Sequence, residues 1–299
     1  MALARALADV PAGRKDEATL IRFLRARKGN VQQAADYYRQ ARRFRDALDV
    51  DGLDERWNLE ALERCFAPWW VRGGIVGHSH EGGVVGWERF GKSQFADLID
   101  LVPFEVLQKL DVVHMVRVLA AFEEDSMRRR EWLGKAILVL DLEGLRWNDC
   151  SMKAIRTYGK LVEARDMLMP NTLKHVFLIR APRWTSMAWD VAKHILHPQT
   201  RAKVEIVSGQ SKSLDVLRRY MPDAAIPAYM GGGLCPGRDP ECRLILGSIG
   251  RLPLEAVERL LELHRQGVER GDKEPERGGS IPRRGEKNLG IVLSCCVCR

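Results

Sequence analysis

Residues 136–140 read Ala-Ile-Leu-Val-Leu, an unbroken apolar run in a chain of 299 residues. Such a run is typical of a parallel strand that is buried on both faces of its sheet. Segments with helical and strand-like patterns alternate after it. The predicted elements are a helix over 150–168, a strand over 175–179, a helix over 185–196, a strand over 204–207 and a helix over 211–220. This β-α-β-α-β order predicts an α/β fold with a mainly parallel sheet and right-handed crossovers.

The chain before this run begins with helical patterns. Residues 16–28 have helical spacing and end at Gly29. Asn30 followed by Gln33 is typical of a capped helix start, and a third helix is predicted over 57–66. The sequence therefore predicts an N-terminal helical bundle. Further elements are a strand over 84–89 and a helix over 103–130.

Composition divides the chain into four parts. We expect a helical region over 1–70, a sheet-containing domain over 71–235, a helical extension over 236–269 and a flexible basic tail over 270–299. The helical extension is predicted from a helical pattern that begins at Pro253. No stretch approaches the ~18 consecutive apolar residues of a membrane-spanning helix. We therefore expect a cytoplasmic protein.

The formal net charge of +8 comes from the two ends of the chain. Residues 1–50 hold 11 basic and 6 acidic residues, residues 270–299 hold 7 and 4, and the remainder holds 30 of each. An anionic membrane surface is therefore the expected partner. Nucleic acid is not expected, because the basic residues form no stripe interleaved with aromatic residues.

The sequence motifs for catalysis and metal binding that we considered are absent or incomplete. The chain has no GxxxxGK[ST] loop and no GxGxxG after a strand. Residues 77–82 resemble a nucleophile elbow, but Glu81 stands where GxSxG needs glycine. His78, His80 and Glu81 are too few ligands for a metal site. The scattered cysteines, which are Cys65, Cys150, Cys235 and Cys242, form no CxxC pair with the spacing of a zinc site. We therefore expect neither an enzyme nor a bound metal or cofactor.

Three ordered sets of residues resemble the CRAL-TRIO lipid-binding family and together cover about residues 16–235. Residues 20–31 resemble the N-terminal helical region of that family, and residues 82–91 resemble its hairpin motif DGRPVxxxRxG. The third set comprises Leu138–Gly144, Met169-Pro170, Phe177–Pro182, Trp189, Lys193, Thr200–Lys203 and Ile226–Gly232. Each motif alone is weak, whereas their order along the chain is specific.

The resemblance implies a hydrophobic lipid cavity with one face of the sheet as its floor and a helix as its gate. That helix follows Ala181-Pro182, and its apolar residues are Trp184, Met187, Trp189, Val191 and Ile195. Such a gate opens at a membrane, where indole rings suit the level of the headgroups. Trp184 and Trp189 have an equally weighted alternative as ordinary packing residues of the core.

The resemblance also implies a lipid-headgroup site of the phosphatidylinositol-transfer type. Lys203 is the lysine of the TxxK element, Arg25 is the basic residue of the first helix, and Asn171 replaces an acidic residue. The Asn171 amide can still donate a hydrogen bond to an inositol phosphate. His175 is expected near this site from the order of the strands. The alternatives are a solvated charge for Lys203 and a structural role for His175.

The choice of lipid depends on two positions in the apolar run. Ala136 and Leu138 stand where some members of the family carry hydroxyl residues that face a choline head. Their apolar side chains disfavour phosphatidylcholine. Arg180 stands where the family usually has asparagine, a replacement without a physical explanation in the sequence.

The end of the tail carries Cys295, Cys296 and Cys298 beside apolar residues and after a basic stretch over 283–287. Clustered thiols in this setting are typical of S-acylation, and several acyl chains with basic residues would anchor the protein stably. The alternative is a disordered tail with reactive thiols.

The leading hypothesis is a non-enzymatic monomer that binds a single hydrophobic lipid, with a phosphoinositide-like phospholipid favoured. It would transfer this lipid between membranes or sense it, in the cytoplasm and peripherally at a membrane surface. The alternative is a protein-interaction module of the same fold with a vestigial cavity.

Overall fold

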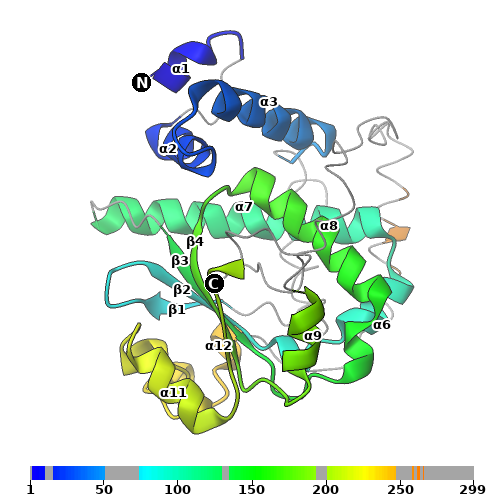
Figure 1. Ribbon diagram of the computed structural model, residues 1–299, viewed down its shortest axis with the longest axis vertical. Helices are drawn as coiled ribbons and strands as arrows, with labels where there is room; N and C mark the ends of the chain where they lie inside the picture. Colours follow the sequence, from blue (N-terminus) through cyan, green and yellow to red (C-terminus); the bar gives the residue numbers. More distant parts are fainter. Residues whose placement is uncertain are drawn as a thin grey trace.

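The computed structural model has N-terminal helices followed by a five-stranded, mainly parallel sheet, which confirms the predicted α/β class (Figure 1). The described residues are 2–10, 16–50, 74–129, 135–192 and 201–246, together with Glu258, Leu261, Glu262 and Arg265. The predicted helix over 57–66 and the tail over 270–299 lie outside them. None of the described helices is long and apolar enough to cross a bilayer.

The sheet has the apolar run over 136–140 in its middle strand. The strands are β1 (Gly74–His78), β2 (Val84–Glu88), β3 (Ala136–Asp141), β4 (Leu173–Ile179) and β5 (Val204–Val207). They pair in chain order, with β1 antiparallel to β2 and every later pair parallel. All six residues of β3 are buried, as the prediction of a fully covered strand requires.

The strand β1 was not predicted, because its sequence Gly-Ile-Val-Gly-His reads as part of a turn. It forms a hairpin with β2 through a turn in which Gly82 has φ 84°. A Cβ at Gly83 would lie 2.4 Å from the carbonyl oxygen of Lys135. Glycine at this position therefore lets the hairpin pack directly against the beginning of β3.

Helices cover both faces of the sheet. On one face lie α6 (Phe95–Leu101), α7 (Phe104–Arg129), α8 (Met152–Leu168) and α9 (Thr185–Ala192), and on the other lie α11 (Gln210–Arg218) and α12 (Arg243–Leu246). The 3-10 helices are η1 (Phe90–Lys92), η2 (Trp147–Cys150), η3 (Asp223–Ala225), η4 (Ala228–Met230) and η5 (Pro236–Arg238). This layered arrangement buries a strand that is apolar on both sides.

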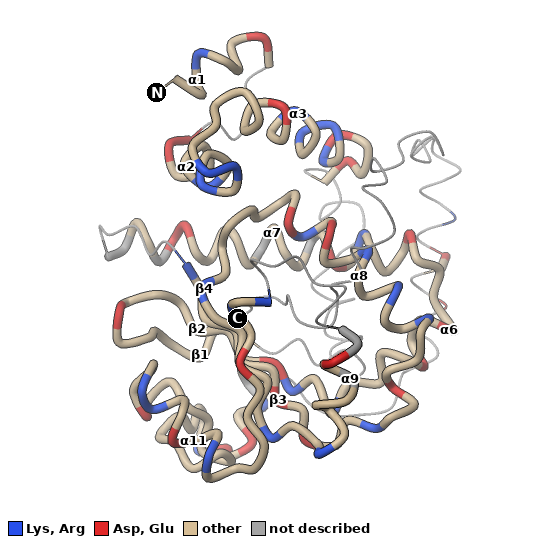
Figure 2. The backbone as a smooth tube through the Cα atoms, in the orientation of Figure 1, with Lys and Arg blue, Asp and Glu red and all other residues tan. Residues whose placement is uncertain are grey.

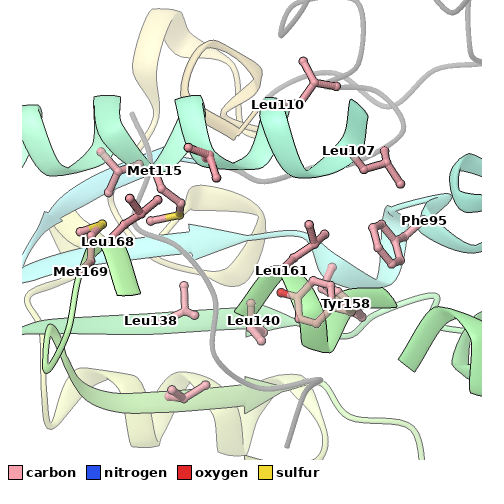
Figure 3. Packing of buried hydrophobic residues seen from close by; sticks show 14 of the residues in the cluster. Phe95, Leu107, Leu110, Met115, Leu138, Leu140, Tyr158, Leu161, Leu168 and Met169 are labelled. Carbon is pink, nitrogen blue, oxygen red and sulfur yellow. The ribbon is translucent and has the colours of Figure 1, made fainter. Parts of the chain in front are cut away.

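Side chains of β3 alternate between two hydrophobic clusters. Leu138 and Leu140 belong to the cluster under α7 and α8, here called the α7–α8 cluster (Figure 3). Ile137 and Val139 belong to the cluster under α11 and α12, the α11–α12 cluster. None of these four side chains is more than 2% exposed. Because successive side chains of a strand point to opposite faces, β3 contacts both helical layers of the domain.

The N-terminal bundle comprises α1 (Ala2–Ala6), α2 (Glu17–Ala26) and α3 (Val31–Ala47). The predicted cap of α3 is confirmed, because the Asn30 side chain accepts a hydrogen bond of 2.9 Å from the Gln33 amide. These helices share a third cluster, which also contains Met167 of α8. The bundle is therefore packed against the end of α8 and not tethered loosely to the domain.

An ion pair between Arg165 of α8 and Asp111 of α7 lies within the described core. Arg165 Nε and Nη2 donate to the two Asp111 carboxylate oxygens at 2.7 and 2.6 Å. The two side chains are 6% and 0% exposed. The geometry is bidentate, which gives a charge-assisted pair both strength and a fixed orientation.

We expect Arg165→Leu to lower the free energy of unfolding by about 3 kcal/mol or more, because it removes the bidentate partner of the buried Asp111 carboxylate. Arg156→Leu is the matched control, since Arg156 lies exposed on the same helix. The control should change stability by less than about 0.5 kcal/mol. Urea denaturation measures both, and equal effects of the two substitutions would contradict a role for the pair.

Candidate functional site

Three residues that precede parallel strands meet at one edge of the sheet. Lys135 comes before β3, Asn171 shortly before β4 and Lys203 before β5, and these strands are neighbours. The backbone confirms the alignment, because the Ala136 amide donates to the Thr172 carbonyl at 2.7 Å and the Val176 amide to the Lys203 carbonyl at 2.9 Å. Parallel pairing therefore gathers an amide and two lysines.

The C-terminal turn of α2 lies opposite this edge. The Gly29 amide donates to the Leu24 carbonyl at 2.8 Å, and Lys28 and Gly29 have φ of 52° and 83°. This is the left-handed ending by which glycine commonly closes a helix. It turns residues 28 and 29 back toward the sheet edge.

A surface pocket of about 480 Å³ lies between the two segments. Its lining residues are Leu24, Arg25, Lys28, Gly29, Lys135 and Asn171. Figure 2 shows the basic residues of α2 on the side of the bundle nearest the strands. The structure thus brings together Arg25 and Asn171, two of the predicted headgroup residues, and adds Lys28 and Lys135, which the motifs did not indicate.

Lys203 lies next to this pocket. Burial and then the charge of Lys135 lower the pKa of the Lys203 ammonium, while the Asp166 carboxylate opposes this shift. Asp166 is itself held by Tyr37 of α3, whose hydroxyl donates to its Oδ2 at 2.9 Å. Burial and Asp166 together raise the pKa of Tyr37, which keeps this hydroxyl protonated as a donor. The region is therefore rich in positive charge held close together.

His175 is not among the residues that line this pocket, although the charge of Lys203 acts on it. Its ring stacks on Phe177 with centroids 5.8 Å apart and meets Tyr220 edge-on at 5.1 Å. Phe177 belongs to the α11–α12 cluster, on the other face from Leu138. Burial and then Lys174 lower the pKa of His175. The role of His175 in headgroup binding stays a prediction.

The predicted cavity residues meet in the α7–α8 cluster. Ala136 and Leu138 are fully buried there, and Trp184 and Trp189 pack against it while partly exposed. Figure 3 shows Leu138 and Leu140 on β3 beside Met115 of α7 and Leu161 and Leu168 of α8.

The predicted gate helix is α9 over its described length. Met187 on this helix points outward and is 61% exposed. Val191 lies in α9, but its side chain is outside the described set, and Ile195, Cys295, Cys296 and Cys298 are outside it altogether.

Trp147 of η2 extends the apolar surface beyond the predicted gate. Its ring lies edge-on to that of Trp184, with centroids 5.3 Å apart, and its side chain is 61% exposed. The motifs that carry the family resemblance do not include this residue. A tryptophan in the polar segment Leu-Arg-Trp-Asn-Asp after β3 was the signal that could have identified it.

Contacts at the opposite edge of the sheet explain why residue 180 is an arginine. Its Nε donates to Asp141 Oδ1 at 2.9 Å, and its Nη1 pairs with Glu143 at 2.8 Å. The Tyr229 hydroxyl donates to Asp141 Oδ2 at 2.9 Å, and Trp87 Nε1 donates to Tyr229 at 2.8 Å. Arg180 therefore fixes the ends of β3 and β4 just before α9 begins.

Comparison with known families agrees with the fold. A model of the CRAL/TRIO domain matches residues 83–232, which is half of the chain. A model of the CRAL/TRIO N-terminal domain matches residues 4–37. The first match contains the sheet edge with its lysines, and the second contains α2, so the pocket joins the two matched regions.

Individual proteins are similar at low identity. "Protein real-time" of Aedes aegypti is 24% identical over 219 residues, and the phosphatidylinositol/phosphatidylcholine transfer protein SFH13 of Arabidopsis thaliana is 25% identical over 263. The matches cover 73% and 82% of this chain but only 33% and 41% of these relatives. The crystal structure of Sfh5 superposes with a TM-score of 0.52 at 13% identity, covering 89% of this chain and 86% of that one, and it shows a shared fold.

We expect Lys203→Met to stabilise the unliganded protein at pH 7, because folding holds the Lys203 ammonium where its pKa is lowered. Between the lowered pKa and the ordinary value of ~10.4, unfolded Lys203 binds more protons than folded Lys203, so stability rises with pH there. The gain from the variant should therefore shrink as the pH rises through that window.

Urea denaturation from pH 7 to pH 10.5 measures how far the free energy of unfolding of Lys203→Met exceeds that of the parent protein. The control is Lys212→Met on α11, where the lysine is exposed. A gain for Lys203→Met that stays constant with pH, or a loss at pH 7, would show that the ammonium carries no such penalty.

Proposed function

Because this chain belongs to the CRAL/TRIO domain family, we propose that it binds one phospholipid and carries it between membranes. Proteins of this family are generally lipid-binding proteins without enzymatic activity. The observation that carries the proposal is the basic pocket, in which Arg25 and Asn171 meet beside Lys203 at the edge of an apolar sheet.

The headgroup would lie in the pocket. Arg25 and Lys203 can neutralise the lipid phosphate, and the Asn171 amide can donate to a phosphate or ring hydroxyl. The Arabidopsis relative is named as a transfer protein for phosphatidylinositol and phosphatidylcholine. We favour an inositol headgroup here, because the charged and amide donors match its phosphate and hydroxyls and because Ala136 and Leu138 bring no hydroxyl toward a choline.

The acyl chains would replace contacts within the α7–α8 cluster. This cluster joins Leu138 and Leu140 of β3 to apolar residues of α7, α8 and α9. Movement of α9 away from the sheet would expose this surface for loading, and a membrane would shelter it during exchange. The half-buried Trp184 and Trp189 fit such a movable cover, because they belong to the cluster without being enclosed by it.

The proposal places the protein in the cytoplasm with reversible attachment to membranes. Outward-facing Met187 and Trp147 supply apolar contact at the surface around α9. Acylation of Cys295, Cys296 or Cys298 would add a second means of attachment, and two such signals together anchor a protein more stably than one.

We expect the purified protein to retain about one phospholipid per chain and to accelerate phospholipid movement between vesicles, since a bound ligand stabilises the fold that encloses it. Mass spectrometry of solvent extracts identifies the lipid, and a fluorescent-lipid transfer assay measures the rate. Protein without bound lipid and without transfer activity would reject the proposal and favour a protein-interaction module.

We expect Met187→Asp to slow transfer roughly tenfold, because it removes the burial of an apolar side chain at the membrane, worth about 1.5 kcal/mol. The fold should tolerate this change, since Met187 is 61% exposed and lies in the first turn of α9, where a carboxylate is favourable. Met127→Asp is the control, because Met127 is 72% exposed on α7.

Transfer rate and thermal midpoint are measured on the same samples. Equal transfer rates for the two variants would show that α9 does not meet the membrane through Met187. A large fall in the midpoint of Met187→Asp would instead assign this side chain to the packing of the fold.

A further inference from the structure

Cys235 and Cys242 are two thiols that the proposed lipid site does not use. Cys235 is exposed, whereas Cys242 is buried in the α11–α12 cluster. Their separation along the chain is not the CxxC spacing of a redox motif, so their pairing is not indicated by the sequence. The fold nevertheless brings the buried thiol back beside the exposed one.

Two successive turns reverse the chain between these cysteines. The Arg238 amide donates to the Cys235 carbonyl at 3.2 Å, and the Cys242 amide donates to the Asp239 carbonyl at 2.9 Å. Gly237, Arg238 and Cys242 have φ of 62°, 60° and 55°, in the left-handed region that tight reversals use. The two ends of the segment 235–242 therefore lie side by side.

The position of the Cys242 sulfur shows how close these ends are. Its thiol donates to the Leu234 carbonyl at 3.1 Å. This carbonyl and the Cys235 amide belong to one peptide group, so the sulfur lies beside the backbone of Cys235. The exposed side chain of Cys235 can rotate about its Cα–Cβ bond, and this rotation can bring the two sulfurs into bonding distance.

The electrostatics of Cys242 agree with this proximity. Burial raises the pKa of its thiol most, and the charges of an ionised Cys235 and of the Asp239 and Glu241 carboxylates raise it further. The Ala228 amide opposes these effects, because it can donate a hydrogen bond to the thiolate. Cys242 is thus a buried thiol, while Cys235 is the one that an oxidant in solution meets first.

We propose that Cys235 and Cys242 form a reversible disulfide when the protein meets a hydroperoxide. The Cys235 thiolate attacks one peroxide oxygen, the O–O bond breaks, and the hydroxide or alkoxide that leaves takes up a proton. The Cys242 sulfur then attacks the sulfur of the resulting sulfenic acid, and the hydroxyl group leaves as water with the Cys242 proton. Two thiols are thereby oxidised to one disulfide, and one peroxide is reduced.

The residue after Cys235 narrows the fate of the sulfenic acid. A sulfenic acid can also condense with a backbone amide nitrogen and give a cyclic sulfenamide. The next residue is Pro236, whose nitrogen carries no hydrogen to lose. The neighbouring thiol of Cys242 is therefore the favoured partner of this intermediate.

The disulfide would close a segment that is bonded to the carboxyl edge of the sheet. Arg89 Nη1 donates to Glu241 Oε2 at 2.7 Å, and the Tyr229 amide donates to the Pro240 carbonyl at 3.1 Å. The Tyr229 hydroxyl in turn donates to Asp141. Oxidation would hold both ends of this segment together and make its local opening less frequent.

Trypsin gives a direct readout of the proposed bond, because it cleaves after Arg238, between the two cysteines. Residues 220–238 and 239–243 become separate peptides with one cysteine each, and a disulfide joins them into one mass that a reductant divides. The full-length protein is treated with an equimolar amount of hydrogen peroxide, and its remaining thiols are alkylated. The digest is then analysed by mass spectrometry with and without reductant, and thermal midpoints verify that each sample is folded.

We expect the joined peptides to exceed any disulfide of Cys150 at least about tenfold, since a protonated thiol reacts slowly. Cys150 is a suitable internal control, because burial raises the pKa of its thiol to about 11. Cys150→Ser should leave the joined peptides unchanged. Cys242→Ala should abolish them and leave the Cys235 sulfenic acid, trapped with dimedone, at least about fivefold above the parent.

Cys235→Ser serves if Cys242→Ala does not fold, because Cys235 is exposed. It should abolish the joined peptides and leave Cys242 reduced. Oxidation of Cys235 in the folded parent without the joined peptides would overturn the inference. The same holds if Cys150 forms disulfides as readily as Cys242, if the joined peptides appear only in protein unfolded by guanidinium chloride, or if neither thiol reacts.

Discussion

Burial of β3 on both of its faces is the constraint on which the rest of the structure depends. A strand with apolar side chains on each face is stable only between two covering layers, and its parallel neighbours need long crossovers to return the chain. Helices α6 and α7 lie between β2 and β3 in the chain, α8 lies between β3 and β4, and α9 follows β4. Together they form one layer. Parallel pairing also gives β2 to β5 the same direction, so the residues before β3, β4 and β5 share one edge. The position of the pocket follows from the hydrophobic pattern of the core.

The two edges of the sheet consequently have different chemistry. At the amino edge, Lys135 and Lys203 lie close enough for their charges to repel, and the Asp166 carboxylate offsets only part of this effect on Lys203. At the carboxyl edge, Arg180 is bonded to Asp141 and Glu143, and Tyr229 completes the network. Paired charges fix a backbone in place, whereas like charges held together favour an incoming counter-ion. One edge is thus suited to support and the other to binding.

Much of this arrangement could be predicted from the sequence, because the signals were local. The run over 136–140 identified the central strand, and Asn30 with Gln33 identified the start of α3. The strand β1 was not predicted, because its two glycines are typical of a turn. Its formation depends on pairing with β2, which is a tertiary contact. Arg180 had no explanation, because its main partner Asp141 is 39 residues away in the chain. Lys135 could have been found, since it directly precedes a predicted parallel strand. The face of His175 could also have been found, since it shares the two-residue period of Phe177.

The walls of the pocket belong to two parts of the chain, the N-terminal bundle and the sheet, which also meet through α8. Leu24, Arg25 and Lys28 come from the N-terminal bundle with its own cluster, while Lys135 and Asn171 belong to the sheet. A headgroup bound there as proposed would contact both parts and hold them together. Local opening of the bundle would have to break these contacts, and release of the headgroup would remove them. If the pocket holds a headgroup as proposed, opening of residues 16–50 would be coupled to occupancy, so the bundle would respond to whether a lipid is bound.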